Sequence, residues 1–126
     1  MKLTRRQTMK RASEFAMVRA EGSSAAGRFL VLSAAPLSGG AAAADAEAAE
    51  SRFGIITTRK LGHAVVRNML RRRVREILRA HGEPLSTGRY VVIIPRIHAA
   101  TASYEQLERD FIKQMKRLLR TETKAC

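Results

Sequence analysis

The sequence predicts an α+β fold in which a small sheet packs with helices, in the order helix, strand, strand, helix, strand, helix. Short apolar runs with β-branched residues alternate with longer stretches whose apolar residues recur at helical spacing. A length of 126 residues suits one domain, so residues 1–126 are expected to fold as a single unit. The expected elements are helices over residues 11–21, 64–80 and from Ser103 onward, and strands over residues 28–34, 52–58 and 90–94.

The first three elements are predicted from short patterns. Phe15 and Val18 share one face of the first helix, and Gly22 ends that helix. The run RFLVLSA stops before Pro36, and the run RFGIITT is rich in β-branched side chains, as strands are. Residues 37–51 between the two runs include no basic residue and little bulk, so we expect a flexible, acidic and Ala-rich loop there.

The last three elements have clearer boundaries. Gly82 and Pro84 break the helical pattern of residues 64–80 just beyond its end. The continuous run YVVII is typical of a strand buried on both faces, so we expect it to lie centrally in the sheet. The last helix begins at a capping box, Ser103 with Gln106 three residues later. One apolar stripe of this helix is expected to close the core: Tyr104, Leu107, Phe111, Met115 and Leu118.

The chain is strongly basic, with 24 Lys and Arg against 11 Asp and Glu and a formal net charge of +13. This charge attracts polyanions, so nucleic acid is the expected partner. The sequence has no stretch of about 18 apolar residues, and Cys126 is its only cysteine, so we expect a cytoplasmic protein with no membrane partner. Aromatic residues make up 5%, so arginine must supply more of the affinity than base stacking does.

Residues 59–79, RKLGHAVVRNMLRRRVREILR, contain eight Lys and Arg and a single acidic residue, Glu76. At 100° per residue, one side of the expected helix is apolar and the other is cationic. The apolar side consists of Val66, Leu70, Val74 and Ile77, and a wedge of about 60° on the opposite side holds Asn68, Arg72, Arg75 and Arg79. Arg59 and Lys60 form a basic turn ahead of this helix, where Gly62 permits close approach of a backbone.

A solvated helix face would explain many charge runs, but it would normally mix Glu with Lys and Arg. Like charges three or four residues apart on a helix repel each other. An anionic ligand would relieve this repulsion, and the planar fork of arginine suits phosphate oxygens. Charge alone leaves RNA and DNA both open, because phosphate contacts carry no sequence information.

The segment RFGIITTRKLGHAVVRNMLRRRVREILR resembles the signature of the bacterial ribonuclease P protein component. The signature is a strand, a basic turn with glycine, and then R-N-x-x-[KR]-R-x-x-R-E. Here the matching residues are Arg67, Asn68, Arg71, Arg72, Arg75 and Glu76. The first helix, the YVVII strand and the basic last helix follow in the family's order, so the resemblance covers nearly the whole chain.

The resemblance implies a subunit that binds the catalytic RNA of ribonuclease P and promotes endonucleolytic removal of the 5′ leader from precursor tRNA. It implies an α/β sandwich with an unusual left-handed βαβ crossover formed by the arginine helix. It places that helix on the RNA and a leader-binding cleft between the first helix and the sheet. By position, the cleft would be lined by Phe15, Arg19, Leu30 and Leu32, and the RNA-binding residues would be Arg59, Lys60, Arg67, Asn68, Arg71, Arg72, Arg75 and Arg79.

The sequence departs from the family pattern at three positions. Met69 stands where the family often has a basic residue after the Arg-Asn pair, and we expect Arg73 to replace that contact. Arg19 and Leu32 stand where the family has aromatic residues, so leader binding should depend more on charge and less on stacking.

No residue of this chain is expected to be catalytic or to bind a metal tightly. His63, His81 and His98 lie in different segments without carboxylates at ligand spacing. Hydrolysis is therefore assigned to Mg²⁺ ions held mainly by the RNA subunit, as the resemblance implies. No obligate protein partner is expected.

Two other function classes fit parts of this pattern. A noncatalytic structural RNA-binding protein of the ribosomal type would carry a similar basic helix. An autonomous nuclease would need clustered acidic or histidine residues that the sequence lacks, and a DNA-binding role lacks helix-turn-helix spacing ahead of the basic helix. Stimulation of precursor-tRNA cleavage by the catalytic RNA at low Mg²⁺ separates the ribonuclease P subunit from a structural RNA binder.

Overall fold

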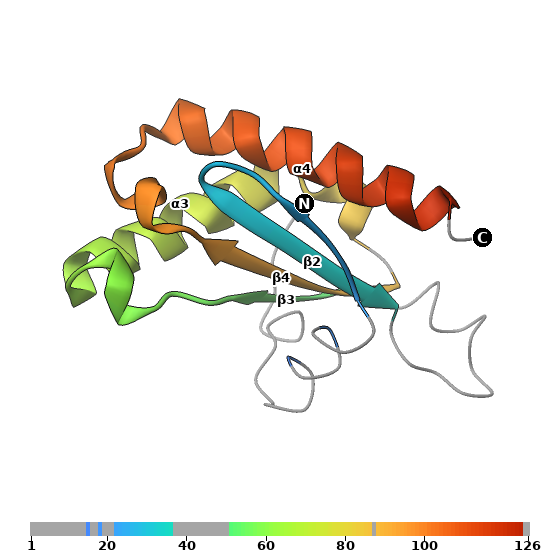
Figure 1. The fold of residues 1–126 in the computed structure, drawn as a ribbon, viewed down its shortest axis with the longest axis horizontal. Helices are drawn as coiled ribbons and strands as arrows, with labels where there is room; N and C mark the ends of the chain where they lie inside the picture. Colours follow the sequence, from blue (N-terminus) through green and yellow to red (C-terminus); the bar gives the residue numbers. More distant parts are fainter. Residues whose placement is uncertain (1–14, 16–17, 19–21, 37–50, 87, 125–126) are drawn as a thin grey trace.

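The fold is a mixed sheet covered on one face by two helices (Figure 1). The computed structural model describes residues 15, 18, 22–36, 51–86 and 88–124. In this part of the chain the strands are ordered β1-β2-β4-β3. Their bounds are Ser23–Ala26 for β1, Leu30–Pro36 for β2, Arg52–Ile55 for β3 and Arg89–Pro95 for β4.

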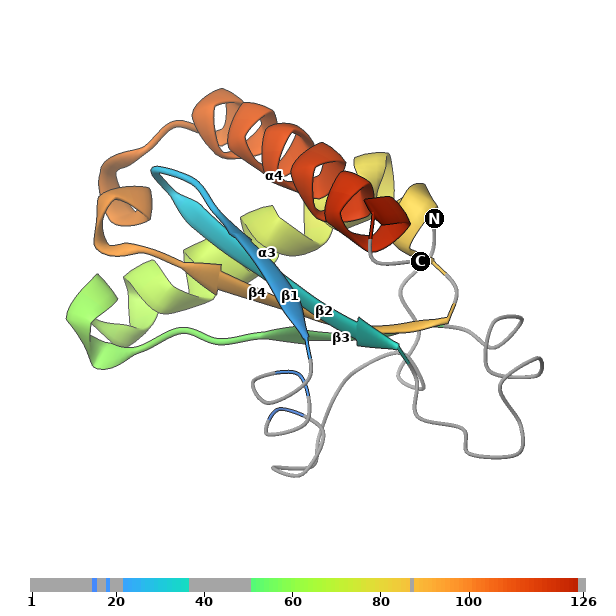
Figure 2. The ribbon, with the colours of Figure 1, turned by 45° about the vertical axis from the view of Figure 1, so that its right-hand side comes forward.

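Two long helices, α3 (Ala64–His81) and α4 (Tyr104–Lys124), lie on the same side of the sheet (Figure 2). Short 3-10 turns connect the elements, and their bounds are Arg59–Leu61 for η3, Glu83–Leu85 for η4 and Ile97–Thr101 for η5. The helices and the sheet together build the α+β layers that the sequence predicts.

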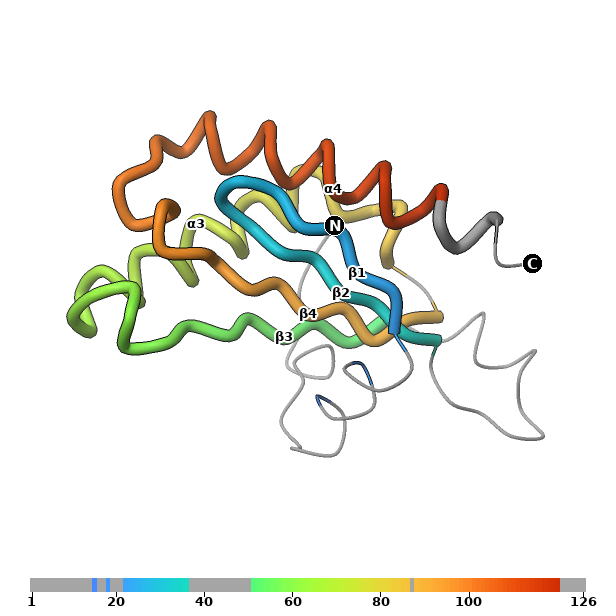
Figure 3. The backbone as a smooth tube through the Cα atoms, viewed as in Figure 1, coloured from blue at the N-terminus to red at the C-terminus, as the bar shows by residue number. Residues whose placement is uncertain are grey.

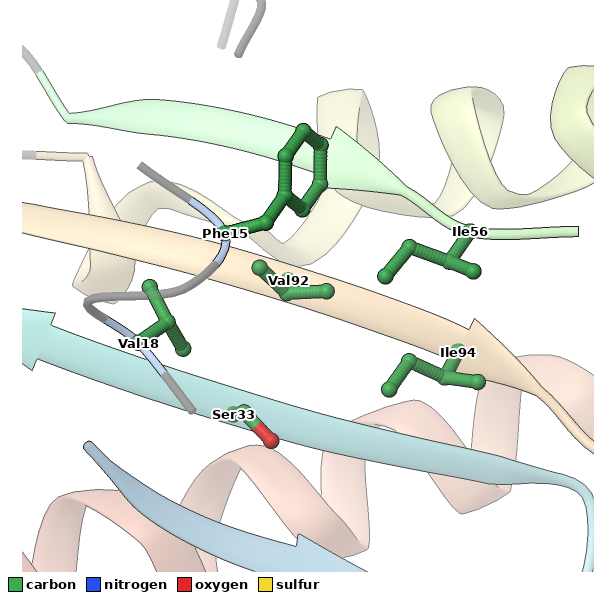
Figure 4. Close-up of a pocket in the computed structure, with 6 residues that line it drawn as sticks. All are labelled: Phe15, Val18, Ser33, Ile56, Val92 and Ile94. Carbon is green, nitrogen blue, oxygen red and sulfur yellow. The ribbon is translucent and has the colours of Figure 1, made fainter. Parts of the chain in front are cut away.

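The strand pairing combines a hairpin with a crossover. β1 turns back into β2 as an antiparallel hairpin, visible at the start of the coloured trace (Figure 3). β2 pairs antiparallel with β4 and β4 pairs parallel with β3. In Figure 1 the parallel strands β3 and β4 both run toward the left, β4 lies above β3, and α3 lies behind them. A chain that passes from β3 back through α3 and forward again into β4 in this arrangement turns in the left-handed sense. Figure 4 shows the same arrangement, with the helices again behind the strands. The crossover implied by the family resemblance is therefore present.

The sheet separates two apolar clusters. Leu30 and Leu32 of β2 are fully buried against α3 and α4, in a cluster that includes Leu70 and Phe111. Val92 of β4 belongs to a smaller cluster on the other face, with Val18 and Ala35. Alternate residues of one strand point to opposite faces, so β2 and β4 each contribute to both clusters.

A buried carboxylate joins α4 to the β1–β2 hairpin. Asp110 Oδ2 accepts hydrogen bonds of 2.9 Å from the backbone nitrogens of Phe29 and Leu30, and Asp110 Oδ1 accepts one of 3.0 Å from Gln114. The approach of this side chain requires glycine at position 27, since a Cβ there would lie 2.2 Å from Asp110 Oδ1. The hairpin turn is thus fixed to α4 by polar contacts as well as by apolar packing.

Most of the predicted elements are confirmed. β4 lies between β2 and β3, as expected for YVVII. In the capping box, Ser103 N donates to Gln106 Oε1 at 2.9 Å and Gln106 N donates to Ser103 Oγ at 3.2 Å. The predicted helix over residues 11–21 lies outside the described residues except for Phe15 and Val18, which are helical.

Several expectations about the elements differ from the structure, and the strand expected over residues 28–34 spans Leu30–Pro36 as β2. β1 was not predicted, because the segment SSAA has no apolar alternation and is a strand only through its pairing with β2. β3 ends at Ile55 rather than residue 58, since the chain enters the turn before η3. Ser51, expected in the flexible loop, is fully buried and its Oγ accepts a 3.1 Å hydrogen bond from Arg89 N. Residues 37–50 of that loop lie outside the described residues.

Candidate nucleic-acid interface

The outer face of α3 presents a row of polar and cationic side chains to solvent. Leu70, Val74 and Ile77 are fully buried beneath it. The exposed residues on the opposite side are Asn68, Arg72, Arg75 and Arg79. We call these four residues the α3 row. Its position confirms the division of this helix into an apolar and a cationic side.

The α3 row keeps most of its charge available. Neither Arg72 nor Arg75 forms an ion pair or hydrogen bond with another described residue. Glu76 Oε1 pairs with Arg79 at 2.8 Å, as expected for neighbours three residues apart, and both side chains are 53% exposed. An exposed pair of this kind is worth little and opens readily to a stronger anion.

Two further motif residues flank the α3 row and are partly buried. Arg71 donates a 2.8 Å hydrogen bond from its guanidinium to Asn68 Oδ1, which holds both side chains in place. Arg67 is half-buried, and its Nε is enclosed without a hydrogen-bond partner in the described part of the chain. An enclosed donor without an acceptor is unfavourable, so a phosphate oxygen reaching Arg67 would gain more than an exposed contact gives.

The basic turn lies immediately before α3. Arg59 and Lys60 are exposed on η3. Gly62, which ends η3, has φ of 131°, a conformation that side-chain-bearing residues rarely adopt. This glycine lets the chain reverse from η3 into α3, which places both cations next to the start of the α3 row.

The expected substitute for the missing basic residue is not at the interface. The guanidinium of Arg73 donates a 3.0 Å hydrogen bond to the carbonyl oxygen of Ala102, in the segment just before α4. Met69 packs partly buried against the main core. Arg73 points toward the α4 side of α3, so the expectation that it replaces a phosphate contact near Met69 is wrong.

The open face of the sheet holds a shallow apolar pocket (Figure 4). Phe15 lies in front of the sheet in this view, and the side chains of Val92 and Ile94 lie on the same face of β4. The other lining residues are Val18, Ser33 and Ile56. Phe15, one of the expected cleft residues, therefore does line a groove beside the sheet.

Leu30 and Leu32 do not line this groove, and the expectation that they do is wrong. Both are fully buried on the opposite face, against α3 and α4. Because strand side chains alternate, Ser33 rather than its neighbour Leu32 faces the groove. The sequence showed that side chains of β2 alternate between the two faces of the sheet. It did not show whether the even-numbered or the odd-numbered residues face the helices. Arg19, the remaining expected cleft residue, lies outside the described residues.

The described residues include no obvious metal centre and no membrane span. No group of three or more His, Cys, Asp or Glu is placed there to hold a metal ion. No described helix is both long and apolar enough to cross a membrane.

Taken together, the fold and the exposed arginines define a small α+β protein with a cationic crossover helix suited to a nucleic-acid backbone. Comparison with known proteins gives the family. Residues 3–119 match the family model described as Ribonuclease P. The chain therefore belongs to the ribonuclease P protein family.

Individual relatives agree with this assignment. The ribonuclease P protein component of Acidothermus cellulolyticus is 30% identical over 119 residues, which covers 94% of this chain and 93% of that protein. The corresponding protein of Syntrophomonas wolfei is 36% identical over 67 residues, and this match spans only 56% of its length, about half. The solved structure of the Staphylococcus aureus RNase P protein has a TM-score of 0.72 at 23% identity, covering 87% of this chain and 93% of that one, and supports the fold.

Proposed function

We propose that this protein is the protein subunit of ribonuclease P. It binds the catalytic RNA, contacts the 5′ leader of precursor tRNA, and promotes endonucleolytic removal of that leader in the cytoplasm. The observation that carries this proposal is the exposed α3 row above a buried apolar side, in which Arg72 and Arg75 form no ion pair or hydrogen bond with another described residue. Family membership supplies the identity of the RNA.

The α3 row and the basic turn form the RNA-binding surface in this proposal. Arg72 and Arg75 supply exposed guanidinium groups, which can bind phosphate oxygens in a bidentate manner. Arg67 and Asn68 lie beside them, and Arg59 and Lys60 extend the surface beyond the start of α3. Since Arg67, Asn68, Arg72 and Arg75 project from one helix, the backbone positions that carry them are fixed before RNA binds, which lowers the entropic cost of association.

The groove on the open face is proposed to hold the leader. Phe15 offers an aromatic surface for one base, and Val92 and Ile94 provide an apolar floor. Ser33 is a small hydroxyl donor at its edge. These residues replace Leu30 and Leu32 as the leader-binding set.

The chemistry is proposed to reside outside this chain. Mg²⁺ ions bound mainly by the RNA would activate water and stabilise the leaving oxygen. The described residues offer no ligand cluster for such an ion. This chain would then act by binding and orienting the two RNAs, and it needs no protein partner to do so.

Reconstitution tests the proposal directly. The full chain should increase cleavage of precursor tRNA by a bacterial ribonuclease P RNA at low Mg²⁺. A variant with Arg72→Ala and Arg75→Ala should bind that RNA more weakly, with a salt dependence shallower by about 2 in the slope of log K against log salt. Filter binding across a salt series measures both quantities.

A variant with Arg28→Ala and Arg96→Ala is the matched control. It removes the same charge from the β1–β2 turn and from the residue after β4, where Arg96 hydrogen-bonds to Gly27 O, and it leaves the α3 row unchanged. The control should keep nearly the wild-type slope. A wild-type chain that binds the RNA yet never stimulates cleavage would instead indicate the rival function, a noncatalytic structural RNA-binding protein.

A further inference from the structure

Helix α4 carries a second line of basic side chains. Arg109, Lys113, Lys116 and Arg120 are all exposed, and we call them the α4 row. Their spacing of four, three and four residues places them within about 60° of one another around the helix. The fully buried residues of α4, Leu107, Phe111 and Leu118, lie on the opposite side. The α4 row therefore points away from the core.

The acidic groups that the structure describes do not neutralise the α4 row. None of the four side chains forms an ion pair or hydrogen bond with another described residue. Glu105 stands four residues before Arg109 without pairing with it. The nearby Asp110 is buried and occupied by the hairpin nitrogens.

The arrangement carries a cost that an external anion would remove. Arg109 and Lys113, like Lys116 and Arg120, are four residues apart, and Lys113 and Lys116 are three apart. Like charges at these spacings destabilise a helix. A helix face that is only exposed to solvent would normally include acidic residues that offset its basic ones. The four positions of the α4 row are all basic, so exposure to solvent alone does not explain them.

Phosphate backbone fits this row better than a lipid surface does. The row extends for about 16 Å along the helix axis, enough to face several successive phosphates of one strand. A helix that lies on a membrane also inserts exposed apolar side chains. In the described part of the chain the exposed large apolar residues are Val65 and Ile97, and neither is on α4. RNA is therefore the favoured anion.

The two rows are separated by acidic groups in the seam between the helices. His81 Nε2 of α3 and Glu108 Oε2 of α4 lie 3.0 Å apart across this seam. Glu108 and Glu76 also both act on Tyr104, where burial chiefly, and then their negative charges, raise the pKa of its hydroxyl. These carboxylates repel phosphate, so one RNA strand is not expected to run continuously from the α3 row to the α4 row.

We propose that the α4 row is a second RNA-binding face, which contacts a phosphate backbone segment distinct from the one held by the α3 row. This inference rests on the proposed function for the choice of RNA and goes beyond it in assigning a separate surface. The protein then holds two RNA segments on two faces of one domain.

The test compares two versions of α4 in the full chain. One variant carries Arg109→Gln, Lys113→Gln, Lys116→Gln and Arg120→Gln, which removes the charge and keeps long side chains. Its control carries Arg109→Lys, Lys113→Arg, Lys116→Arg and Arg120→Lys, which keeps the charge. Binding to a bacterial ribonuclease P RNA is measured across a salt series, with the Arg72→Ala, Arg75→Ala variant alongside.

The charge-removing variant should show a slope shallower by about 3, and the charge-keeping control should match the wild type. Equal slopes for all three proteins, or equal loss in the control, would overturn the inference. A change confined to binding of vesicles with anionic phosphatidylglycerol would overturn it in favour of a membrane. If the α3 variant alone loses binding, the proposed function stands and the α4 assignment fails. A wild-type chain that does not bind this RNA would overturn both.

Protection of lysines from chemical modification can be measured in the wild-type complex. This experiment does not depend on whether a substituted protein folds correctly. The ε-amino groups of Lys113 and Lys116 should react several-fold more slowly with an amine-acylating reagent when the catalytic RNA is bound. Peptide mass spectrometry reports each lysine separately. Unchanged acylation rates at both positions would overturn the inference.

Discussion

The two faces of the sheet are built from alternate residues of the same strands, yet they differ in how completely they are covered. On the helix side, Leu32 and Ile93 are fully buried beneath α3 and α4. On the open side, Ser33 and Ile94 line a groove that only Phe15 and Val18 cover among the described residues. One face thus supplies the stability of the domain, and the other keeps an apolar surface available for a ligand.

The largest expected effect comes from truncating the covered face. Leu32→Ala removes a fully buried side chain and leaves a cavity, so it should lower the free energy of unfolding by about 2 to 5 kcal/mol. Ile94→Ala, at the half-buried groove, should cost only about 1 kcal/mol. Urea denaturation of both variants measures the difference. Equal losses would mean that the two faces contribute alike to stability.

A second expected effect concerns the hydrogen bonds by which Asp110 joins α4 to the β1–β2 hairpin. Asp110→Ala leaves the backbone nitrogens of Phe29 and Leu30 without their acceptor, so it should destabilise the protein by about 3 kcal/mol. Asp110→Asn keeps one acceptor oxygen and should lose less. Thermal unfolding of the two variants orders them. A reversed order would show that the negative charge, rather than hydrogen bonding, fixes the hairpin to α4.

A smaller effect on stability, with a selective effect on binding, is expected from the open face. Phe15→Ala should weaken binding of precursor tRNA with a leader about fivefold, because one base loses its stacking surface. Binding of mature tRNA by the same reconstituted complex should not change. An equal loss of affinity for both tRNAs would contradict the proposal that the groove binds the leader.

The smallest effect is a pH dependence on the helix side. Burial, followed by the charges of Glu108 and Glu76, raises the pKa of Tyr104 above the ordinary 10.0. The neutral hydroxyl is favoured in the folded protein, so this contribution to stability is complete below pH 10 and is lost as pH rises through the raised pKa. Tyrosinate absorbance, compared with Tyr104→Phe, should show a late-titrating group. Titration at or below the ordinary value would contradict the assignment.

The sequence predicted the elements better than it predicted which way they face. Helical spacing divided α3 correctly, since Leu70, Val74 and Ile77 repeat at a period that only one buried face explains. A strand repeats every two residues, so β2 offered two equally regular faces. The choice of Leu32 for the groove failed for this reason, and α3 and α4, which decide the choice, are distant in sequence.

Other features depend on contacts that sequence patterns do not encode. β1 has no apolar repeat, and pairing with β2 alone makes it a strand. Arg73 belongs to the same basic run as Arg72, yet it hydrogen-bonds to Ala102 O, twenty-nine residues away. The spacing of the α4 row could have been recognised in the sequence. The role predicted for this helix, closing the core, came from the apolar stripe on its other side. The eight predicted RNA-binding residues remain a prediction that the binding experiments test.

The left-handed path through α3 decides what the rest of the molecule can do. Had the connection between β3 and β4 turned the other way, α3 would have packed over Val92 and Ile94, and no groove would remain there. Leu30 would then have lost part of its cover. The rare left-handed turn thus keeps α3 off the side of the sheet that Phe15 and Val18 cover, and it still places a cationic helix beside the sheet.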